Sequence, residues 1–167
     1  MNEIVIETTR LRLVAKTLDG VRTQIKGMTA DERAELSSEW LSQLESPTVD
    51  VWTLGFDMID RATGMAIGGC GFKGPPGADR VVEIAYGVAP SYQGSGYATE
   101  SAAALVAYAF RSGRVRLVRA HTRSSVNASS RVLTKCGFRA VGEVIDPEDG
   151  LVSRWEIVQD PTARRID

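Results

Sequence analysis

The sequence predicts an α/β (α+β) fold in one domain, residues 1–167, with one long mixed sheet and helices on both sides of it. Runs with strand-type alternation are interleaved with runs whose apolar residues recur at helical spacing. A glycine-rich loop joins one strand run to the start of an alanine-rich helical run. The length is comfortable for a single domain, and no internal repeat or low-complexity segment divides the chain.

The N-terminal part predicts one strand followed by helices. Residues 9–15 alternate in the manner of a half-buried strand, and residues 18–28 are weakly helical. Thr29 and Glu32 have the spacing of a capping box, in which each side chain bonds the backbone N–H of the other residue. The helix that they begin is expected to run to about Leu44, shortly before a proline.

Three strands are expected in the middle of the chain. Residues 51–59 and 65–72 predict two strands joined by a hairpin turn at residues 60–64. Residues 80–88 predict the third strand, in which three apolar side chains share one face and Glu83 lies on the other.

The second half predicts helices and strands in alternation. Residues 100–111 carry an apolar stripe at helical spacing, which suits a helix packed on the sheet. A strand over residues 115–122 and a helix over residues 127–135 follow. Residues 138–145 and 151–158 predict a final hairpin.

The loop between residues 88 and 100 predicts an anion-binding site. Gly94 and Gly96 flank Ser95, and glycine allows positive φ and close approach of a ligand. The N–H groups of a helix N-terminus lack intrahelical partners, and the helix dipole adds roughly half a positive charge there. The pattern therefore favours an anion with several oxygens, in the first place a pyrophosphate.

Specific residues argue against the two common nucleotide loops. The Walker loop ends in Gly-Lys-Ser/Thr, whereas this loop ends Gly96-Tyr97-Ala98. The dinucleotide fingerprint needs a third glycine and an acidic residue about 20 positions further on. Here the third glycine is missing, and no Asp or Glu occurs between Glu100 and Glu143.

The spacing that does match is Gln/Arg-x-x-Gly-x-Gly/Ala, from Gln93 to Ala98, and it resembles the coenzyme A loop of the GNAT N-acetyltransferases. The strand from Glu83 to Val88 and the segment from Asn127 to Phe138 agree with that family. Residues 6–13 look like the first strand of the RimJ/RimL-type branch. This resemblance covers nearly the whole chain. It implies a mostly antiparallel sheet that is splayed between its fourth and fifth strands.

The resemblance also implies an activity and a set of cofactor contacts. A GNAT enzyme moves an acetyl group from acetyl-CoA to a primary amine by direct attack in a ternary complex, without a metal. The N–H of Val88 is the expected donor to the oxyanion. The residues expected at the cofactor are Val88, Gln93, Gly94, Ser95, Gly96, Tyr97, Ala98, Thr99 and Asn127.

Two residues are candidates for proton transfer. Glu83 is the candidate base, and its alternative role is a strand residue paired with an arginine such as Arg80. Many GNAT enzymes place a tyrosine acid in the helix before Gly-Phe, but this helix has none. Ser129 matches the serine of RimL-like members through the pattern Ala-Ser-x-Arg-Val-Leu. It could otherwise be a helix-capping residue.

Three further residues are considered for the site. Asn127 lies two positions before the serine instead of the usual three, so either the turn is remodelled or that cofactor contact is lost; a plain N-cap is another option. His121 is expected to be structural. Cys136 is expected to be buried and inert, because the sequence offers no activating base for an acyl-cysteine route.

The acceptor amine is left open by the residues. A protein α-amine has a pKa near 7.7–8.0, so it needs far less help from a base than a lysine near 10.4. The RimJ/RimL-type resemblance also points to protein N-termini, although related enzymes modify small amines such as aminoglycosides and polyamines. The expected acceptor wall is acidic and aromatic, unless it is merely a solvated face. It comprises Glu32, Glu35, Glu39, Trp40, Glu45, Asp50 and Trp52.

Composition narrows the partners. A net charge of −1 argues against nucleic acid, and no apolar run approaches the roughly 20 residues that span a membrane. Two cysteines without metal spacing, together with the lack of a signal peptide, favour the cytoplasm. Homodimers are common in this branch, which leaves a homodimer open, but nothing in the sequence fixes an interface. The rival functions are a non-catalytic acyl-CoA-binding module and a protein that binds the phosphates of another nucleotide.

Overall fold

Eight strands form one sheet in the order β1-β2-β3-β4-β5-β6-β8-β7 in a computed structural model, which describes residues 3–123, 128–147 and 149–159. Neighbouring strands are antiparallel except for β5 and β6, which are parallel. This confirms the mixed, mostly antiparallel sheet that the sequence predicts. The strands are β1 Val5–Glu7, β2 Leu11–Ala15, β3 Phe56–Asp60, β4 Ala66–Phe72, β5 Val81–Val88, β6 Leu117–Arg123, β7 Arg139–Asp146 and β8 Gly150–Val158.

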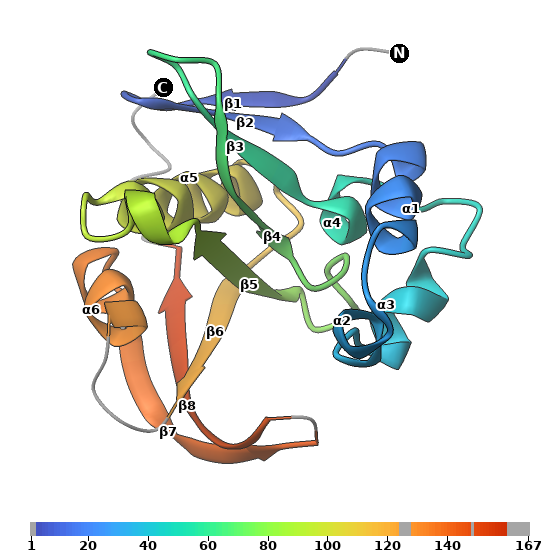
Figure 1. Cartoon of the computed structure of the whole chain (residues 1–167). Helices are drawn as coiled ribbons and strands as arrows, with labels where there is room; N and C mark the ends of the chain where they lie inside the picture. Colours follow the sequence, from blue (N-terminus) through green and yellow to red (C-terminus); the bar gives the residue numbers. More distant parts are fainter. Residues whose placement is uncertain (1–2, 124–127, 148, 160–167) are drawn as a thin grey trace.

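Six α-helices are described, and Figure 1 shows α1 to α4 gathered beside one end of the central strands, on the far side from α6. The helices are α1 Leu18–Lys26, α2 Ala30–Ala34, α3 Ser38–Gln43, α4 Val51–Leu54, α5 Tyr97–Arg111 and α6 Ala128–Lys135, with a 3₁₀ turn at Pro90–Tyr92. In the part of the chain that is described, no helix is long and apolar enough to cross a bilayer.

The core lies between α5 and the sheet. Val82 and Ile84 of β5 share one buried cluster with Leu105 and Ala109 of α5, as the apolar stripe of that helix predicts. Leu105 is fully buried, so its truncation to alanine would cost about 2–5 kcal/mol of stability. The opposite face of β5 carries Glu83 and is therefore free for a site.

The strand expected over residues 51–59 is wrong in its first half. Residues 51–54 form α4, because the Asp50 side chain accepts a hydrogen bond from the N–H of Trp52 at 3.1 Å and starts a helical turn. Gly55 has a φ of +79° and ends that turn, so the strand starts only at Phe56.

The single helix expected from Thr29 to Leu44 is also wrong. The capping box is present and starts α2, with the Glu32 N–H bonded to the Thr29 hydroxyl at 3.1 Å. The Ser37 side chain then accepts a hydrogen bond from the Trp40 N–H at 3.2 Å and starts a separate helix, α3. Two local caps thus divide one apolar pattern into two short helices.

The first strand expected from the family resemblance proves to be a hairpin. β1 and β2 pair in the register Ile6 with Leu13, and the Thr8 N–H bonds to the Leu11 carbonyl at 2.9 Å in the turn between them. This turn places Arg10 next to the N-terminus of α5.

The sheet is splayed between β5 and β6. These are the fourth and fifth of the strands expected from the sequence, over residues 80–88 and 115–122, so the splay lies where the resemblance implies. The two strands pair only at Val81 with Leu117, Val82 with Val118 and Glu83 with Arg119. β5 then continues to Val88 beside β4, whereas β6 continues beside β8. Figure 1 shows the two strands separating beyond this short ladder.

Candidate functional site

The glycine loop lies at the N-terminus of α5 with its backbone exposed. Gly94 and Gly96 have φ values of +79° and +86°, and no side chain caps the first turn of the helix. A Cβ atom at Gly94 would meet nothing within 4 Å. The loop and the 15-residue helix therefore present unbonded N–H groups and the positive end of a dipole to solvent, which fits a pyrophosphate.

Other residues of the loop tie it to its surroundings. The Gln93 side-chain amide donates to the Val88 carbonyl at 2.9 Å, which joins the loop to the end of β5. The rings of Tyr97 and Tyr92 meet edge to face with their centroids 6.2 Å apart. The Thr99 carbonyl accepts a hydrogen bond from the Cys136 thiol at 3.5 Å, which joins α5 to the end of α6.

Arg10 contacts this loop, although the sequence pattern gives no sign of it. Its Nη1 donates to the Ser95 carbonyl at 2.8 Å, and its Nε donates to Glu100 at 2.9 Å. The guanidinium also lies 4.2 Å from the centroid of the Tyr97 ring. Burial alone would raise the pKa of Glu100, but hydrogen bonds from Thr8 and Arg10 and the charge of Arg10 lower it overall.

The edge of β5 that faces the gap carries free backbone groups. Residues of an antiparallel pair alternate between bonding the partner strand and facing away from it. The Lys73 N–H bonds the Glu83 carbonyl at 2.9 Å and the Ala89 N–H bonds the Ile67 carbonyl at 2.8 Å, which fixes the phase of this alternation. The N–H groups of Tyr86 and Val88 are accordingly directed away from β4, toward the splay.

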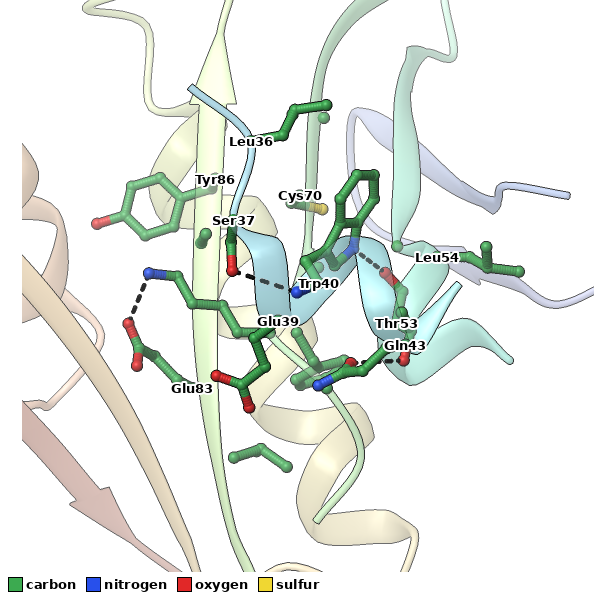
Figure 2. A pocket seen from close by; sticks show the side chains of 18 of the residues that line it. Leu36, Ser37, Glu39, Trp40, Gln43, Thr53, Leu54, Cys70, Glu83 and Tyr86 are labelled. Carbon is green, nitrogen blue, oxygen red and sulfur yellow. Dashed lines mark hydrogen bonds and ion pairs between the residues drawn. The ribbon is translucent and has the colours of Figure 1, made fainter. Parts of the chain in front are cut away.

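A groove of about 1020 Å³ lies on the Glu83 face of β5. Its floor is formed by β4 and β5, and its rim by the α2–α3 region and the turn between β7 and β8. Figure 2 shows Glu39 and Glu83 directing their carboxylates into the same part of this groove. Gly87 leaves open space on the floor, since a Cβ there would meet nothing within 4 Å.

Only part of the expected acceptor wall lines this groove. Glu35, Glu39 and Trp40 do so, and Trp40 is fixed by a hydrogen bond from its indole N–H to the Thr53 carbonyl at 2.9 Å. Glu32 instead completes the cap of α2, and Trp52 is buried in the core. Asp146 and Asp149 add further carboxylates from the β7–β8 turn. Acidic side chains along the groove outnumber its two lysines, Lys16 and Lys73.

The carboxylate of Glu83 is held by two neighbours, and Arg80 is not one of them. Lys73 Nζ and His121 Nδ1 each lie 2.9 Å from Oε2 of Glu83. Arg80 instead donates to the Gly113 and Arg114 carbonyls after α5, so the arginine pairing considered from the sequence is wrong. Burial lowers the pKa of Lys73, but the hydrogen bond and charge of Glu83 and the nearby aspartates raise it overall.

His121 belongs to this cluster, which its position in the sequence does not reveal. Arg154 of β8 donates from Nε to His121 Nε2 at 3.1 Å. Because a guanidinium can only donate, Nε2 accepts this hydrogen bond, and Nδ1 is the ring nitrogen that faces Glu83. The Nδ1 atom is buried, and its contact with Glu83 is close but not aligned as a hydrogen bond.

Ser129 lies across the splay from β5, at the start of α6. The Tyr86 hydroxyl donates to the Ser129 carbonyl at 3.4 Å, a long hydrogen bond that links the strand to the helix. Burial raises the pKa of Tyr86 to about 12, so the phenol stays protonated at neutral pH. No contact joins Ser129 to Glu83 among the described residues, and Asn127 lies outside them.

The two thiols are poor nucleophiles in these surroundings. Cys70 lies on the groove floor, and burial raises its pKa to about 12. Burial also raises the pKa of Cys136. Among the residues that the structure describes, no three His, Cys, Asp or Glu side chains come together as metal ligands.

A family model and a curated relative that match this chain both describe N-acetyltransferases. The model of the acetyltransferase (GNAT) domain family matches residues 14–139. The uncharacterized N-acetyltransferase YjdG of Bacillus subtilis (strain 168) is 25% identical over 150 residues, which are 81% of this chain and 89% of that protein.

Two solved structures share the fold over almost their whole length. RimL, a ribosomal L7/L12 alpha-N-protein acetyltransferase in complex with coenzyme A, has a TM-score of 0.69 at 19% identity, covering 94% of this chain and 99% of that one. The ribosomal-protein-S5-alanine acetyltransferase from Vibrio fischeri has a TM-score of 0.69 at 13% identity, covering 95% and 98%.

Proposed function

Because the chain belongs to the GNAT acetyltransferase family, which uses acetyl-CoA, we propose that it acetylates the α-amine of a protein or peptide N-terminus. One observation carries the placement of the reaction. The open edge of β5 leads to the exposed anion loop at the end of this strand. The Glu83 face of the same strand lines the acidic groove. A donor bound along that edge and an acceptor in the groove would meet at β5.

The cofactor is proposed to lie along the loop and the open edge. The N–H groups from Gly94 to Thr99 would hold the pyrophosphate, and Gln93 would keep the loop against β5. The N–H of Val88 would donate to the acetyl carbonyl, since it is directed into the splay. Acetyl-CoA supplies the activated acetyl group when it is bound.

Glu83 is the proposed base. Its carboxylate lines the groove and can take a proton from the acceptor amine, either directly or through a water. His121 would pack against this carboxylate, and Arg154 would hold the imidazole in place through Nε2. Lys73 balances the charge of Glu83 in the free protein.

Ser129 is the proposed acid that protonates the departing sulfur. It is supported by its position at the start of α6, where Tyr86 reaches it from the open edge of β5. Tyr86 offers a second hydroxyl at this place, and it stays protonated at neutral pH because burial raises its pKa to about 12. Both hydroxyls come from elements that border the splay.

A protein α-amine is supported by the activities named for RimL and the S5-alanine acetyltransferase. It also suits a site with a single candidate carboxylate base, because such an amine is partly neutral at pH 7. The second candidate acceptor is a small polycationic amine. The acidic groove favours it, since Glu35, Glu39, Asp146 and Asp149 accompany Glu83 there.

Calorimetric titration with acetyl-CoA, with ATP and NAD as controls, tests the cofactor assignment. We expect binding of acetyl-CoA alone in the micromolar range, about −8 kcal/mol. A thiol-release screen then compares peptides with free and blocked N-termini, lysine side chains and polyamines. Turnover only with free peptide N-termini supports the proposal, and turnover only with polyamines selects the second candidate. Binding without turnover on any amine indicates an acyl-CoA-binding module.

A further inference from the structure

We propose, on the basis of the function given above, that Arg10 is a positioning residue for the pyrophosphate of acetyl-CoA. It would hold the anion loop in its binding conformation and offset the charge of Glu100 at the helix start. Nothing in the loop pattern requires an arginine 83 positions before Gln93, so this contact is a product of the fold.

Four contacts of Arg10 converge on the start of α5. Its Nη1 bonds the Ser95 carbonyl at 2.8 Å, which fixes the residue between the two positive-φ glycines. Its backbone N–H bonds Oε2 of Glu100 at 2.8 Å, and its Nε bonds Oε1 at 2.9 Å. Its guanidinium lies over the Tyr97 ring. A side chain held by three of these contacts can hold the loop in return.

The charge of Glu100 gives Arg10 a second task. A carboxylate in the first turn suits a free helix, but it repels an anionic ligand at the same N-terminus. Arg10 pairs with this carboxylate and restores a positive potential beside the loop. The Arg10 side chain is 40% exposed, so part of the guanidinium is open to a ligand in solution.

Arg12 provides a matched control close by in the chain. It lies two residues after Arg10, in β2, is exposed, and pairs with Glu7 at 2.9 Å, without a contact to the loop. Replacing either arginine removes one positive charge and one surface ion pair. Only Arg10→Ala removes side-chain contacts to Ser95 and Glu100.

The test is calorimetric titration of the full chain with coenzyme A. We expect Arg10→Ala to raise the Kd about tenfold, equivalent to about 1.4 kcal/mol, and Arg12→Ala to leave it unchanged. A thermal melt of each variant, without ligand, establishes that it is folded. Acetylpantetheine, which lacks the phosphates, serves as a second acetyl donor, and we expect Arg10→Ala to keep the wild-type kcat/KM with it.

The outcomes separate the two proposals. Failure of the wild-type protein to bind coenzyme A would remove the proposed function itself. Wild-type affinity in a folded Arg10→Ala variant would overturn only the role of Arg10. A tenfold loss of kcat/KM with acetylpantetheine, alongside the tenfold loss of affinity for coenzyme A, would do the same. It would reveal a general structural defect.

A double variant tests the electrostatic part. If Arg10 offsets Glu100, then Arg10→Ala/Glu100→Gln binds coenzyme A more tightly than Arg10→Ala. A double variant that binds no better than Arg10→Ala would contradict this part of the proposal.

Discussion

Lys73 and Glu83 face each other across the ends of β4 and β5, with Nζ of the lysine 2.9 Å from Oε2 of the glutamate. Their backbones are paired as well, through the Lys73 N–H and the Glu83 carbonyl at 2.9 Å. His121 contacts the same carboxylate oxygen from β6. Glu83 thus carries a fixed carboxylate and belongs to the last residue pair that joins β5 to β6.

Glu83→Gln should lower kcat by about 10² to 10⁴, because the amide cannot accept the proton of the amine. The affinity for acetyl-CoA should not change, since Glu83 lies on the groove face and not in the anion loop. Thiol release measures kcat, and calorimetry measures the affinity. Glu39→Gln, in the same groove but without a contact to Glu83 or His121, is the control. A kcat near the wild-type value in Glu83→Gln would assign Glu83 to structure alone.

Gly96→Asp should abolish coenzyme A binding. Gly96 has a φ of +86°, and a Cβ there would lie 3.2 Å from Arg10 Nη2, while the new carboxylate would repel the pyrophosphate. Gly64→Asp is the matched control, because Gly64 has a φ of +75° in a remote hairpin turn with open space around it. Calorimetry should detect binding only in the Gly64 variant. Retained affinity in Gly96→Asp would disprove the loop assignment.

Low pH should weaken the contact between the β1–β2 hairpin and α5, which is made by Glu100 with Arg10 and Thr8. The pKa of Glu100 is lowered in the folded chain from its ordinary value of 4.5, so its ionised form stabilises the fold above that pH. This contribution is lost as the pH falls from about 4.5 through the lower folded-state value.

Thermal melts between pH 7 and pH 3 measure this effect. The wild-type protein should lose up to about 1 kcal/mol more than Glu100→Gln over that range, as for other partly exposed ion pairs. Parallel curves for the two proteins would show that Glu100 makes no such contribution.

Cys136→Ser should keep near-wild-type turnover, because acetyl transfer is proposed to be direct and the Cys136 thiol has a raised pKa. Cys70, with a pKa of about 12, should resist alkylation by iodoacetamide at pH 8 in the folded protein. Mass spectrometry after incubation with acetyl-CoA should find neither cysteine acetylated. A stoichiometric acetyl-cysteine would indicate a covalent route instead.

Local signals allowed the sequence to predict the glycine loop and most of the strands. The spacing from Gln93 to Ala98 lies within one turn, and the strands of the sheet carry their own alternation. The helix starts after Ser37 and Asp50 were not predicted, because a single side-chain cap overrides an apolar pattern.

Contacts between distant residues could not be predicted. Arg10 and Glu100 are 90 positions apart, and Glu83 meets His121 only because β5 pairs with β6. Nothing in one sequence identifies such pairs. The site roles, the single domain, the cytoplasmic location and the homodimer stay predictions.

The short ladder between β5 and β6 has a mechanical consequence. With three residue pairs at that seam, the sheet consists of a five-strand part, β1 to β5, and a three-strand part, β6, β8 and β7, in each of which neighbouring strands are hydrogen-bonded. A break in the turn at Gly113, between α5 and β6, would leave each fragment with one complete part of the sheet. Reassembly of the fragments would then restore few backbone hydrogen bonds across the seam. A molecule bound in the gap between β5 and β6 would contact both parts of the sheet and would stabilise their association.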